Sequence, residues 1–304
     1  MKVDIYHLYN HFEYSNCVYP IVLDVLKVWG QSLGFDVRVV VCKEVDVDLE
    51  TGADVVAISV YTQTAPAAYR ISEKLRRAGK VVILGGPHFR GPNYREALSH
   101  CDVVVNTICE DQWKDLLQGI SVGRIEPRRP QALYINDDQN RFRYPDNFYE
   151  AFASQRWYQI PSVPTSIGCP YDCEFCSAYL QGKYILRNLD TIFNEMAHIR
   201  GKTVFLCDAT IGLKKDFTIE LMNRLAPLEK KILVETTLAR LKDDELMDAM
   251  ALGGIKWISV GIETLSVRMG KHGGQNLEDN LKRVIDNAHE RGMLVQGNFI
   301  CGLD

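Results

Sequence analysis

Two successive runs of alternating strand and helix patterns constrain the fold more than any other feature of this sequence. In the first half, short β-branched segments alternate with amphipathic stretches, and residues 20–33 and 66–78 are predicted helices. Strands that are buried on both faces read as continuous apolar runs, and helices between them join parallel neighbours. The predicted strands are "KVDIYHL", "DVRVVVC", "DVVAISVY", "VVILGG" and "DVVVN". The pattern predicts an open, doubly wound parallel sheet of the Rossmann or flavodoxin-like type over residues 1–123.

A second α/β region follows a break in this alternation. Residues 124–160 contain several prolines and polar segments such as "NDDQNRFRYPDN", which predicts a linker. From residue 161 to 304 the alternation resumes, with the predicted strands "VPTSIG", "TVFLCDA", "ILVETTLA", "IKWISVGIE" and "MLVQGNFICG". Helices are predicted over residues 189–199, 217–225, 243–251 and 277–291. This order is typical of part of a (β/α) barrel of the TIM type, in which the chemistry lies at the carboxyl ends of the strands.

Composition and charge exclude several classes of protein. No run of eighteen apolar residues and no signal-peptide pattern is present, so we expect a cytoplasmic protein without a membrane span. The net charge is −4, and the densest basic cluster, Arg124, Arg128 and Arg129, has no interleaved aromatic residues. We therefore expect no nucleic-acid partner. Six of the nine cysteines are scattered, mostly in apolar segments, which favours reduced thiols over a disulfide framework.

The other three cysteines lie close together in "SIGCPYDCEFCSAY", as Cys169, Cys173 and Cys176. They follow the first predicted strand of the second region, so their loop belongs to the catalytic rim of the barrel. Soft thiolates select zinc, copper(I) or iron–sulfur clusters. A zinc site would need completion by Cys207 or a distant histidine. Three ligands to a four-iron cluster would instead leave one iron open to a substrate, which is the interpretation we favour.

This cysteine spacing, with the aromatic Phe175 before the last cysteine, resembles the signature of the radical S-adenosylmethionine (SAM) enzymes. The segments "FLCDATIG", "VETTLARLKDDELMDAMALGGIKWISVGIETLS" and "GMLVQGNFICGLD" are similar to the second to fifth strands of that barrel. The resemblance implies a [4Fe–4S] cluster, whose open iron binds SAM, and a 5′-deoxyadenosyl radical formed with one electron from a donor such as flavodoxin or ferredoxin. Family members continue past the fifth strand, so we expect a barrel that lacks its last strand and carboxyl-terminal tail.

The resemblance also suggests residues that bind SAM, and Phe175 of the cysteine motif is one of them. Glu263 ends an apolar strand, and a buried carboxylate needs hydrogen-bond donors, which ribose hydroxyls, a helix end or a basic side chain would supply. Asp208 is a candidate for contact with the SAM amino group, or alternatively for a helix N-cap. Four other polar residues in apolar strands are candidates for contact with SAM or substrate: Glu235, Thr237, Gln296 and Asn298.

In the first region, "AISVYTQT" and "VVILGGPHFR" resemble the cobalamin-binding domains that precede some radical SAM barrels, including those of the hopanoid methylases. That resemblance places the cobalamin tail against Ser59, Thr62, Gly85 and Gly86. His88 is either a contact to corrin or substrate or a hydrogen-bonded loop residue.

Some residues depart from the cobalamin-binding pattern. An Asp-x-His-x-x-Gly motif is absent, and the first loop offers only His7 and His11, which are more typical of structural residues. We therefore expect cobalamin without a protein histidine below the cobalt. Residues 107–110 replace a Gly-Glu-Gly-Glu segment, and Ile167 stands where an arginine is common. These replacements leave cobalamin binding open.

The function that the sequence favours is cobalamin-dependent methyl transfer to an unactivated centre of a small molecule or lipid. Two alternatives stay open. A cobalamin-free radical SAM enzyme would catalyse a rearrangement, a carbon–carbon bond formation or the transfer of another SAM fragment. A non-catalytic protein would bind zinc or cobalamin alone.

Overall fold

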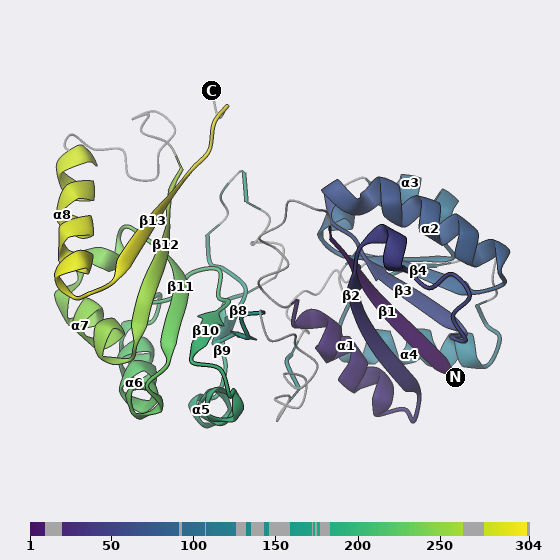
Figure 1. Cartoon of the computed structure of the whole chain (residues 1–304), viewed down its shortest axis with the longest axis horizontal. Coiled ribbons are helices and arrows are strands. Elements are labelled where there is room, and N and C mark those ends of the chain that lie inside the picture. The colour runs from purple at the N-terminus through teal and green to yellow at the C-terminus, as the bar shows by residue number, and fades with distance from the viewer. Residues whose placement is uncertain are drawn as a thin grey trace. The chain divides into compact units, whose positions relative to one another are not determined.

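The chain divides into two compact units, residues 1–151 with 173–183 and residues 152–172 with 184–304. The junction at residues 151 and 152 lies inside the segment predicted as a linker. The computed structural model describes residues 1–9, 20–90, 93–106, 108–125, 132–134, 143–145, 159–171, 173, 175–176, 183–263 and 277–302. Figure 1 shows both units.

The first unit is built on a parallel sheet with the strand order β2-β1-β3-β4-β5-β6. Its strands are β1 (Lys2–Leu8), β2 (Asp36–Cys42), β3 (Val55–Ser59), β4 (Val81–Gly85), β5 (Val103–Val105) and β6 (Ala132–Tyr134). The order reverses at β1, so the carboxyl ends of β1 and β3 border the position where such sheets bind ligands. This sheet confirms the doubly wound class. The sixth strand lies in the predicted linker, because three residues, "ALY", are too short to carry a periodic signal.

Helices cover both faces of this sheet, which explains the continuous apolar strands. They are α1 (Val22–Gln31), α2 (Ala65–Arg77), α3 (Tyr94–His100) and α4 (Glu110–Ser121). The α1 helix contacts α4 on one face, and α2 contacts α3 on the other (Figure 1). Val55, Val82 and Val104 are completely buried between these layers.

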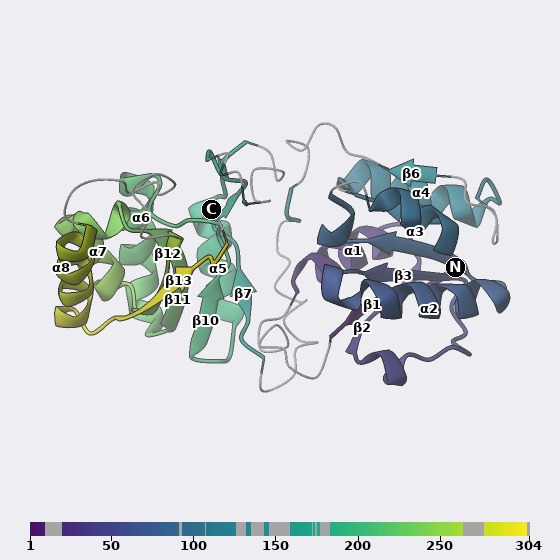
Figure 2. The ribbon, with the colours of Figure 1, turned by 90° about the horizontal axis from the view of Figure 1, so that it is seen from above.

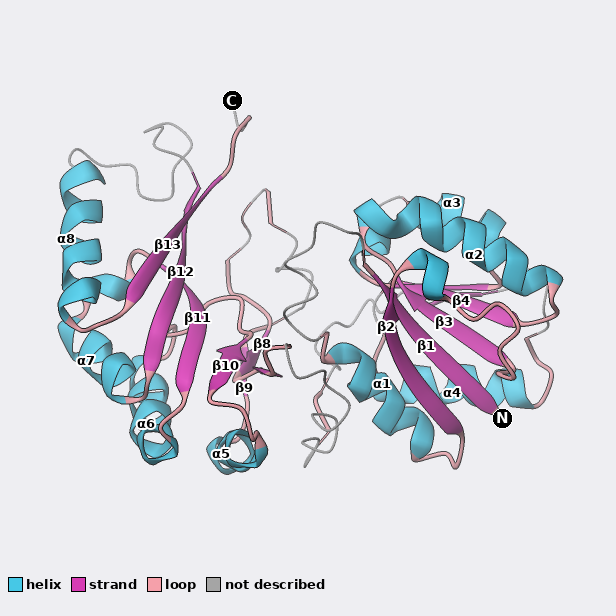
Figure 3. Ribbon diagram, in the orientation of Figure 1, coloured by secondary structure: helices cyan, strands magenta, loops and turns pink. Residues whose placement is uncertain are grey.

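The second unit contains a parallel sheet whose strands follow the chain order, β7-β10-β11-β12-β13. Figure 3 shows β10 to β13 side by side in this order. Its strands are β7 (Ser162–Val163), β10 (Thr203–Leu206), β11 (Lys231–Thr237), β12 (Ile255–Glu263) and β13 (Leu294–Phe299). The intervening helices are α5 (Leu189–His198), α6 (Lys215–Leu225), α7 (Asp244–Leu252) and α8 (Leu277–Glu290). Sequential parallel strands joined by helices form the predicted arc of a (β/α) barrel.

One face of this arc packs against the helices and the other faces away from them. Ile232, Val234 and Thr236 alternate into the helix-facing core along β11, so the odd-numbered residues between them line the inner face. Figure 2 shows this unit from a second direction. Within the described ranges, no helix has both the length and the apolar character needed to cross a membrane.

The predicted strand "VPTSIG" is divided into two strands in the structure. Ser162 and Val163 form β7, whereas β8 (Ser166–Ile167) leaves the sheet and pairs in antiparallel fashion with β9 (Ile185–Leu186). Pro164 separates the two strands, and proline has no N–H to donate to a sheet. The expectation of one continuous strand was therefore wrong, and the β8–β9 ribbon brackets residues 168–184.

Candidate functional site

The cysteine loop begins directly after β8. Gly168 has a left-handed conformation, with φ at +78°, and turns the chain into Cys169. Cys169, Cys173 and Cys176 are all partly buried, and the Cys176 N–H donates to the Cys173 carbonyl at 2.9 Å. The neighbouring Phe175 is 41% exposed.

The three cysteines are divided between the two units. Cys169 belongs to the second unit, whereas Cys173 and Cys176 are grouped with the first. Among the described residues, no three His, Cys, Asp or Glu side chains converge on a position for one metal ion. A four-iron cluster binds each thiolate through a different iron, so its ligands need not converge on one point as the ligands of zinc do. The donor set therefore suits a cluster, and the assignment of these cysteines as its ligands remains a prediction.

Asp208, predicted to contact SAM, is bonded to the chain that leads into the cysteine loop. It is 3% exposed and accepts hydrogen bonds from the N–H groups of Thr165, at 3.0 Å, and Ser166, at 2.5 Å. The hydroxyls of the same two residues also donate to it, at 2.9 Å and 2.5 Å. Burial raises the pKa of Asp208, although the hydrogen bonds from Ser166 and Thr165 act in the opposite direction. The N-cap of α6 is Lys214, so the alternative of a helix N-cap was wrong.

A buried ion pair holds the other end of the ribbon. Arg187, directly after β9, makes a two-fold hydrogen bond with Glu195 of α5 at 2.9 Å and 2.7 Å, and the two side chains are 8% and 0% exposed. Arg187 also donates to the carbonyls of Pro164, at 2.7 Å, and Thr165, at 2.9 Å. Sequence reasoning missed this pair. The available signal was a glutamate in the apolar face of α5, beside Ile192 and Met196.

The inner face of the arc presents polar residues toward the carboxyl ends of its strands. Strand register places three rows across β11, β12 and β13: first Leu233, Trp257 and Leu294, next Glu235, Ser259 and Gln296, and then Thr237, Gly261 and Asn298. The first row is apolar and the later two are polar, apart from Gly261. Asn298 donates to the Ser259 hydroxyl at 2.7 Å, and Gln296 donates to Asn298 at 3.0 Å. Burial raises the pKa of Glu235.

Glu263 stands at the end of β12 in an unusual backbone conformation. Its φ is +65°, and the pairing with β13 shifts register between Gly261 and Glu263. A Cβ at Gly261 would lie 2.3 Å from Glu263 Oε1, so the carboxylate folds back over this glycine. Left-handed residues other than glycine cost about 1–3 kcal/mol and concentrate at functional sites. The conformation brings the carboxylate beside the polar rows.

At the carboxyl edge of the first unit, the loops after β3 and β4 are joined by hydrogen bonds. Ser59 and Gly85 are register partners, and the Val60 N–H donates to the Gly85 carbonyl at 2.7 Å. The His88 N–H donates to the Val60 carbonyl at 3.2 Å. Gly86 has φ at +117°, and a Cβ there would lie 2.7 Å and 2.8 Å from the backbone O and N of Val60. Glycine at this position is therefore required by the chain itself.

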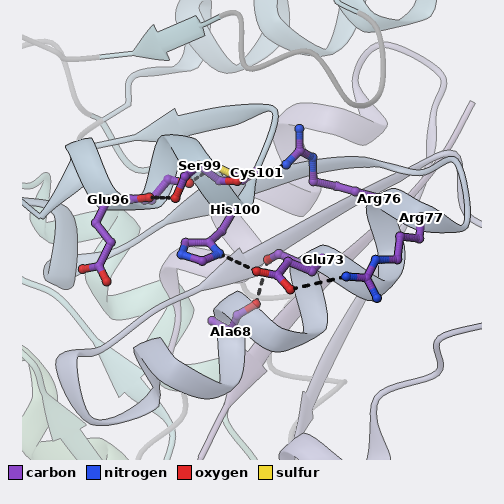
Figure 4. A network of polar contacts seen from close by, with 10 residues as sticks. Ala68, Glu73, Arg76, Arg77, Glu96, Ser99, His100 and Cys101 are labelled. Atoms are coloured by element: carbon purple, nitrogen blue, oxygen red, sulfur yellow. Dashed lines mark hydrogen bonds and ion pairs between the residues drawn. The ribbon is translucent and has the colours of Figure 1, made fainter.

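His88 belongs to a polar network. Its Nδ1 lies 3.1 Å from the Thr62 hydroxyl and its Nε2 lies 3.3 Å from the Tyr69 hydroxyl. Burial lowers the pKa of His88. The Tyr69 ring stacks on His100 at 4.3 Å, and His100 contacts Glu73 at 2.9 Å (Figure 4). These contacts favour the hydrogen-bonded loop histidine over a direct ligand contact.

The departures from the cobalamin-binding pattern have partial structural explanations. Ile167 is buried and pairs with Ile185 in the β8–β9 ribbon, where a strand suits an apolar residue. Cys109 and Glu110 form the start of α4. His7 is buried at the end of β1 and makes an edge contact with the Tyr61 ring at 5.5 Å. His11 and Thr107 lie outside the described residues.

Comparison with known families decides the class of the second unit. Residues 163–304 match the Radical SAM superfamily. This part of the chain is a radical SAM domain. The cysteine loop therefore follows the first strand of a radical SAM domain, and the fold identified from the sequence is confirmed.

The radical SAM domain and the preceding unit have homologues among proteins named as methyltransferases and methylases. The chain is 28% identical over 271 residues to bacteriochlorophyllide d C-12(1)-methyltransferase of Chlorobaculum tepidum. The aligned region covers 84% of this chain and 58% of that protein. It is 27% identical to hopanoid C-2 methylase of Rhodopseudomonas palustris, over 73% of this chain and 44% of that protein. The chain thus spans about half the length of these relatives.

A solved structure shows the same succession of folds. TsrM, a radical SAM methyltransferase from Kitasatospora setae, aligns with 98% of this chain and 69% of its own chain, with a TM-score of 0.71 and 19% identity. That protein was solved with cobalamin and a [4Fe–4S] cluster bound. The likeness supports the doubly wound unit followed by the radical SAM arc.

Proposed function

We propose that this protein is a radical SAM enzyme that transfers a methyl group from SAM to an unactivated centre of a small molecule or lipid, with the help of cobalamin. The observation that carries this proposal is the position of the cysteine loop, which leaves β8 beside the first strand of a radical SAM domain. Relatives named as methyltransferases support the reaction type. We place the enzyme in the cytoplasm, with a flavodoxin- or ferredoxin-like protein as electron donor.

In this proposal, Cys169, Cys173 and Cys176 hold a [4Fe–4S] cluster, and Phe175 lies beside them. When bound, the cluster and SAM supply the 5′-deoxyadenosyl radical. The chain contributes orientation and hydrogen bonds. The Glu263 carboxylate lies at the carboxyl end of β12, where ribose hydroxyls would donate to it. The Asn298–Ser259 pair and Gln296 offer further polar groups on the same inner face.

The first unit offers a site for the tail of cobalamin at the edge where β3 and β4 end. Ser59 is partly exposed beside Gly85, and Thr62 lies in the exposed turn that follows β3. Gly85 and Gly86 present no side chain there, so a ligand can approach the backbone. Cobalamin would supply the methyl carrier. His88 contributes by holding Thr62 in place.

A cobalamin-free radical SAM enzyme is the second candidate, and the same edge supports it. Gly86 is required by its contact with Val60, and Thr62 bonds to His88. Both features are therefore explained without a ligand. Such an enzyme would rearrange its substrate, form a carbon–carbon bond or transfer another fragment of SAM.

Cofactor content separates these candidates. After anaerobic reconstitution with iron, sulfide and hydroxocobalamin, we expect about four irons and one cobalt per chain. Turnover assays should then yield both S-adenosylhomocysteine and 5′-deoxyadenosine. Iron without cobalt, with 5′-deoxyadenosine as the only product, would favour the cobalamin-free enzyme. Zinc alone, unchanged by added iron, would contradict both.

The Gly261→Ala variant tests the role of Glu263. The added methyl group would occupy the position of Glu263 Oε1, which lies at the end of a flexible side chain. We expect the free energy of unfolding to change by less than about 1 kcal/mol, while SAM binds about tenfold more weakly to the reconstituted protein. Equilibrium dialysis with labelled SAM measures this affinity.

Gly297→Ala is the matched control, because its Cβ would meet the end of the Ile262 side chain at 2.6 Å and the edge of the Phe299 ring at 3.4 Å, and not Glu263. Equal SAM affinity in the parent and in Gly261→Ala would remove Glu263 from the SAM site.

A further inference from the structure

The base of the cysteine loop rests on a buried carboxylate supplied by the neighbouring strand. Asp208 comes shortly after β10 and accepts hydrogen bonds from the N–H groups and the hydroxyls of both Thr165 and Ser166. We call these three residues the loop anchor. A carboxylate accepts through two oxygens, and here both are occupied by groups of the same chain. The buried charge is therefore compensated without a ligand.

The loop anchor lies very close to the first cysteine. Only Ile167 and Gly168 separate Ser166 from Cys169. Tyr184, at the far end of the loop, hydrogen-bonds to Ser166. A shift of Ser166 would thus move both the start of the loop and its closing residue.

A second contact fixes the same backbone from the opposite strand of the ribbon. The Arg187 guanidinium, held by Glu195, donates to the Pro164 carbonyl, and the Arg187 N–H donates to the Thr165 carbonyl. Arg187 therefore holds the carbonyls of Pro164 and Thr165, and Asp208 holds the donors of Thr165 and Ser166. Two buried charged groups acting on three consecutive residues form a rigid base.

We propose that Asp208 is a positioning residue that fixes Cys169 for cluster binding, acting through Thr165 and Ser166 rather than through SAM. This inference rests on the proposed function, because it takes Cys169 to be a ligand of the cluster. It gives Asp208 a different role from the amino-group contact implied by the family resemblance.

Asp208→Asn is the main test, because it keeps the size of the side chain and replaces one acceptor oxygen by an NH₂ group, which only donates. Ser166→Ala is a milder variant that removes one hydroxyl donor. Asp243→Asn is the matched control. Asp243 lies in the same unit and accepts the Leu246 N–H at 3.1 Å, but it caps α7.

Three readouts are compared: iron bound after anaerobic reconstitution, the electron paramagnetic resonance spectrum of the reduced cluster, and the rate of tryptic cleavage after the exposed Lys183 in the iron-free chain. For Asp208→Asn we expect at least about threefold less iron, an altered spectrum, and cleavage about tenfold faster. Ser166→Ala should lie between this variant and the parent, and Asp243→Asn should match the parent.

The outcomes also separate this inference from the proposed function. Normal iron content and an unchanged spectrum in Asp208→Asn, with weaker SAM binding, would overturn the inference and make Asp208 a SAM ligand. A parent protein that binds no iron would overturn the proposed function and, with it, the role of Cys169. Unchanged cleavage after Lys183 in both variants would show that the anchor does not order the loop.

Discussion

Replacing Cys169 with alanine is expected to reduce the iron bound after reconstitution from about four per chain to less than about one. The cysteine loop supplies only three thiolates. With one of them removed, the remaining two cannot keep the cluster from being lost to solvent. Formation of 5′-deoxyadenosine should fall at least about a thousandfold, because radical formation depends entirely on the cluster. Elemental analysis and product chromatography measure the two effects.

Two other cysteines provide controls for this experiment. Cys301 is exposed near the end of the described chain, and Cys301→Ala should leave the iron content unchanged. Cys207→Ala tests one form of the zinc alternative, in which Cys207 and not a distant histidine is the fourth ligand, and we expect it to leave the iron content unchanged. Parent-like iron content in Cys169→Ala would remove the cysteine loop from the cofactor site.

Gly86→Ala is expected to destabilise the first unit by about 2–5 kcal/mol. Alanine rarely adopts the φ of +117° found here, and its Cβ would overlap the backbone of Val60, which cannot move without breaking its bond to Gly85. Denaturant unfolding followed by circular dichroism measures the loss. Hydrogen exchange should locate it at the N–H groups of Val60 and His88.

Gly85→Ala is the matched control one residue earlier. Its Cβ would lie 3.5 Å from Val105, which is an ordinary contact, and the backbone is that of a strand. We expect a change within about 1 kcal/mol. Equal destabilisation in the two variants would mean that the loss of glycine flexibility, and not the contact with Val60, determines the cost.

The order of strands and helices could be predicted from the sequence because buried parallel strands have a distinctive composition. The helix predicted over residues 66–78 is α2 (Ala65–Arg77), and the one predicted over residues 277–291 is α8 (Leu277–Glu290). Other elements were missed or merged. The helices α3 and α4 and the short strands β6 and β9 were not predicted, and β8 was merged with β7 into one strand. Strands of two or three residues pair through tertiary contacts that no local pattern reveals.

The candidate site could be predicted in part, because side chains alternate between the two faces of a strand. Alternation along "IKWISVGIE" places Ser259, Gly261 and Glu263 on one face, which the structure confirms. The partners of Asp208 could not be inferred, because Thr165 lies 43 residues away and their contact exists only after β7 and β10 pair. The left-handed conformation of Glu263 likewise arises from the register shift beside β13.

The separation of β8 and β9 from the main sheet has a consequence for how this protein can change. The ribbon closes the cysteine loop on itself, and Asp208 and Arg187 hold only its base. Insertions or deletions between Gly168 and Tyr184 would therefore leave the strands of the arc in register. Apart from the three cysteines and their spacing, the sequence of this loop can therefore change without redesign of the strands beneath it.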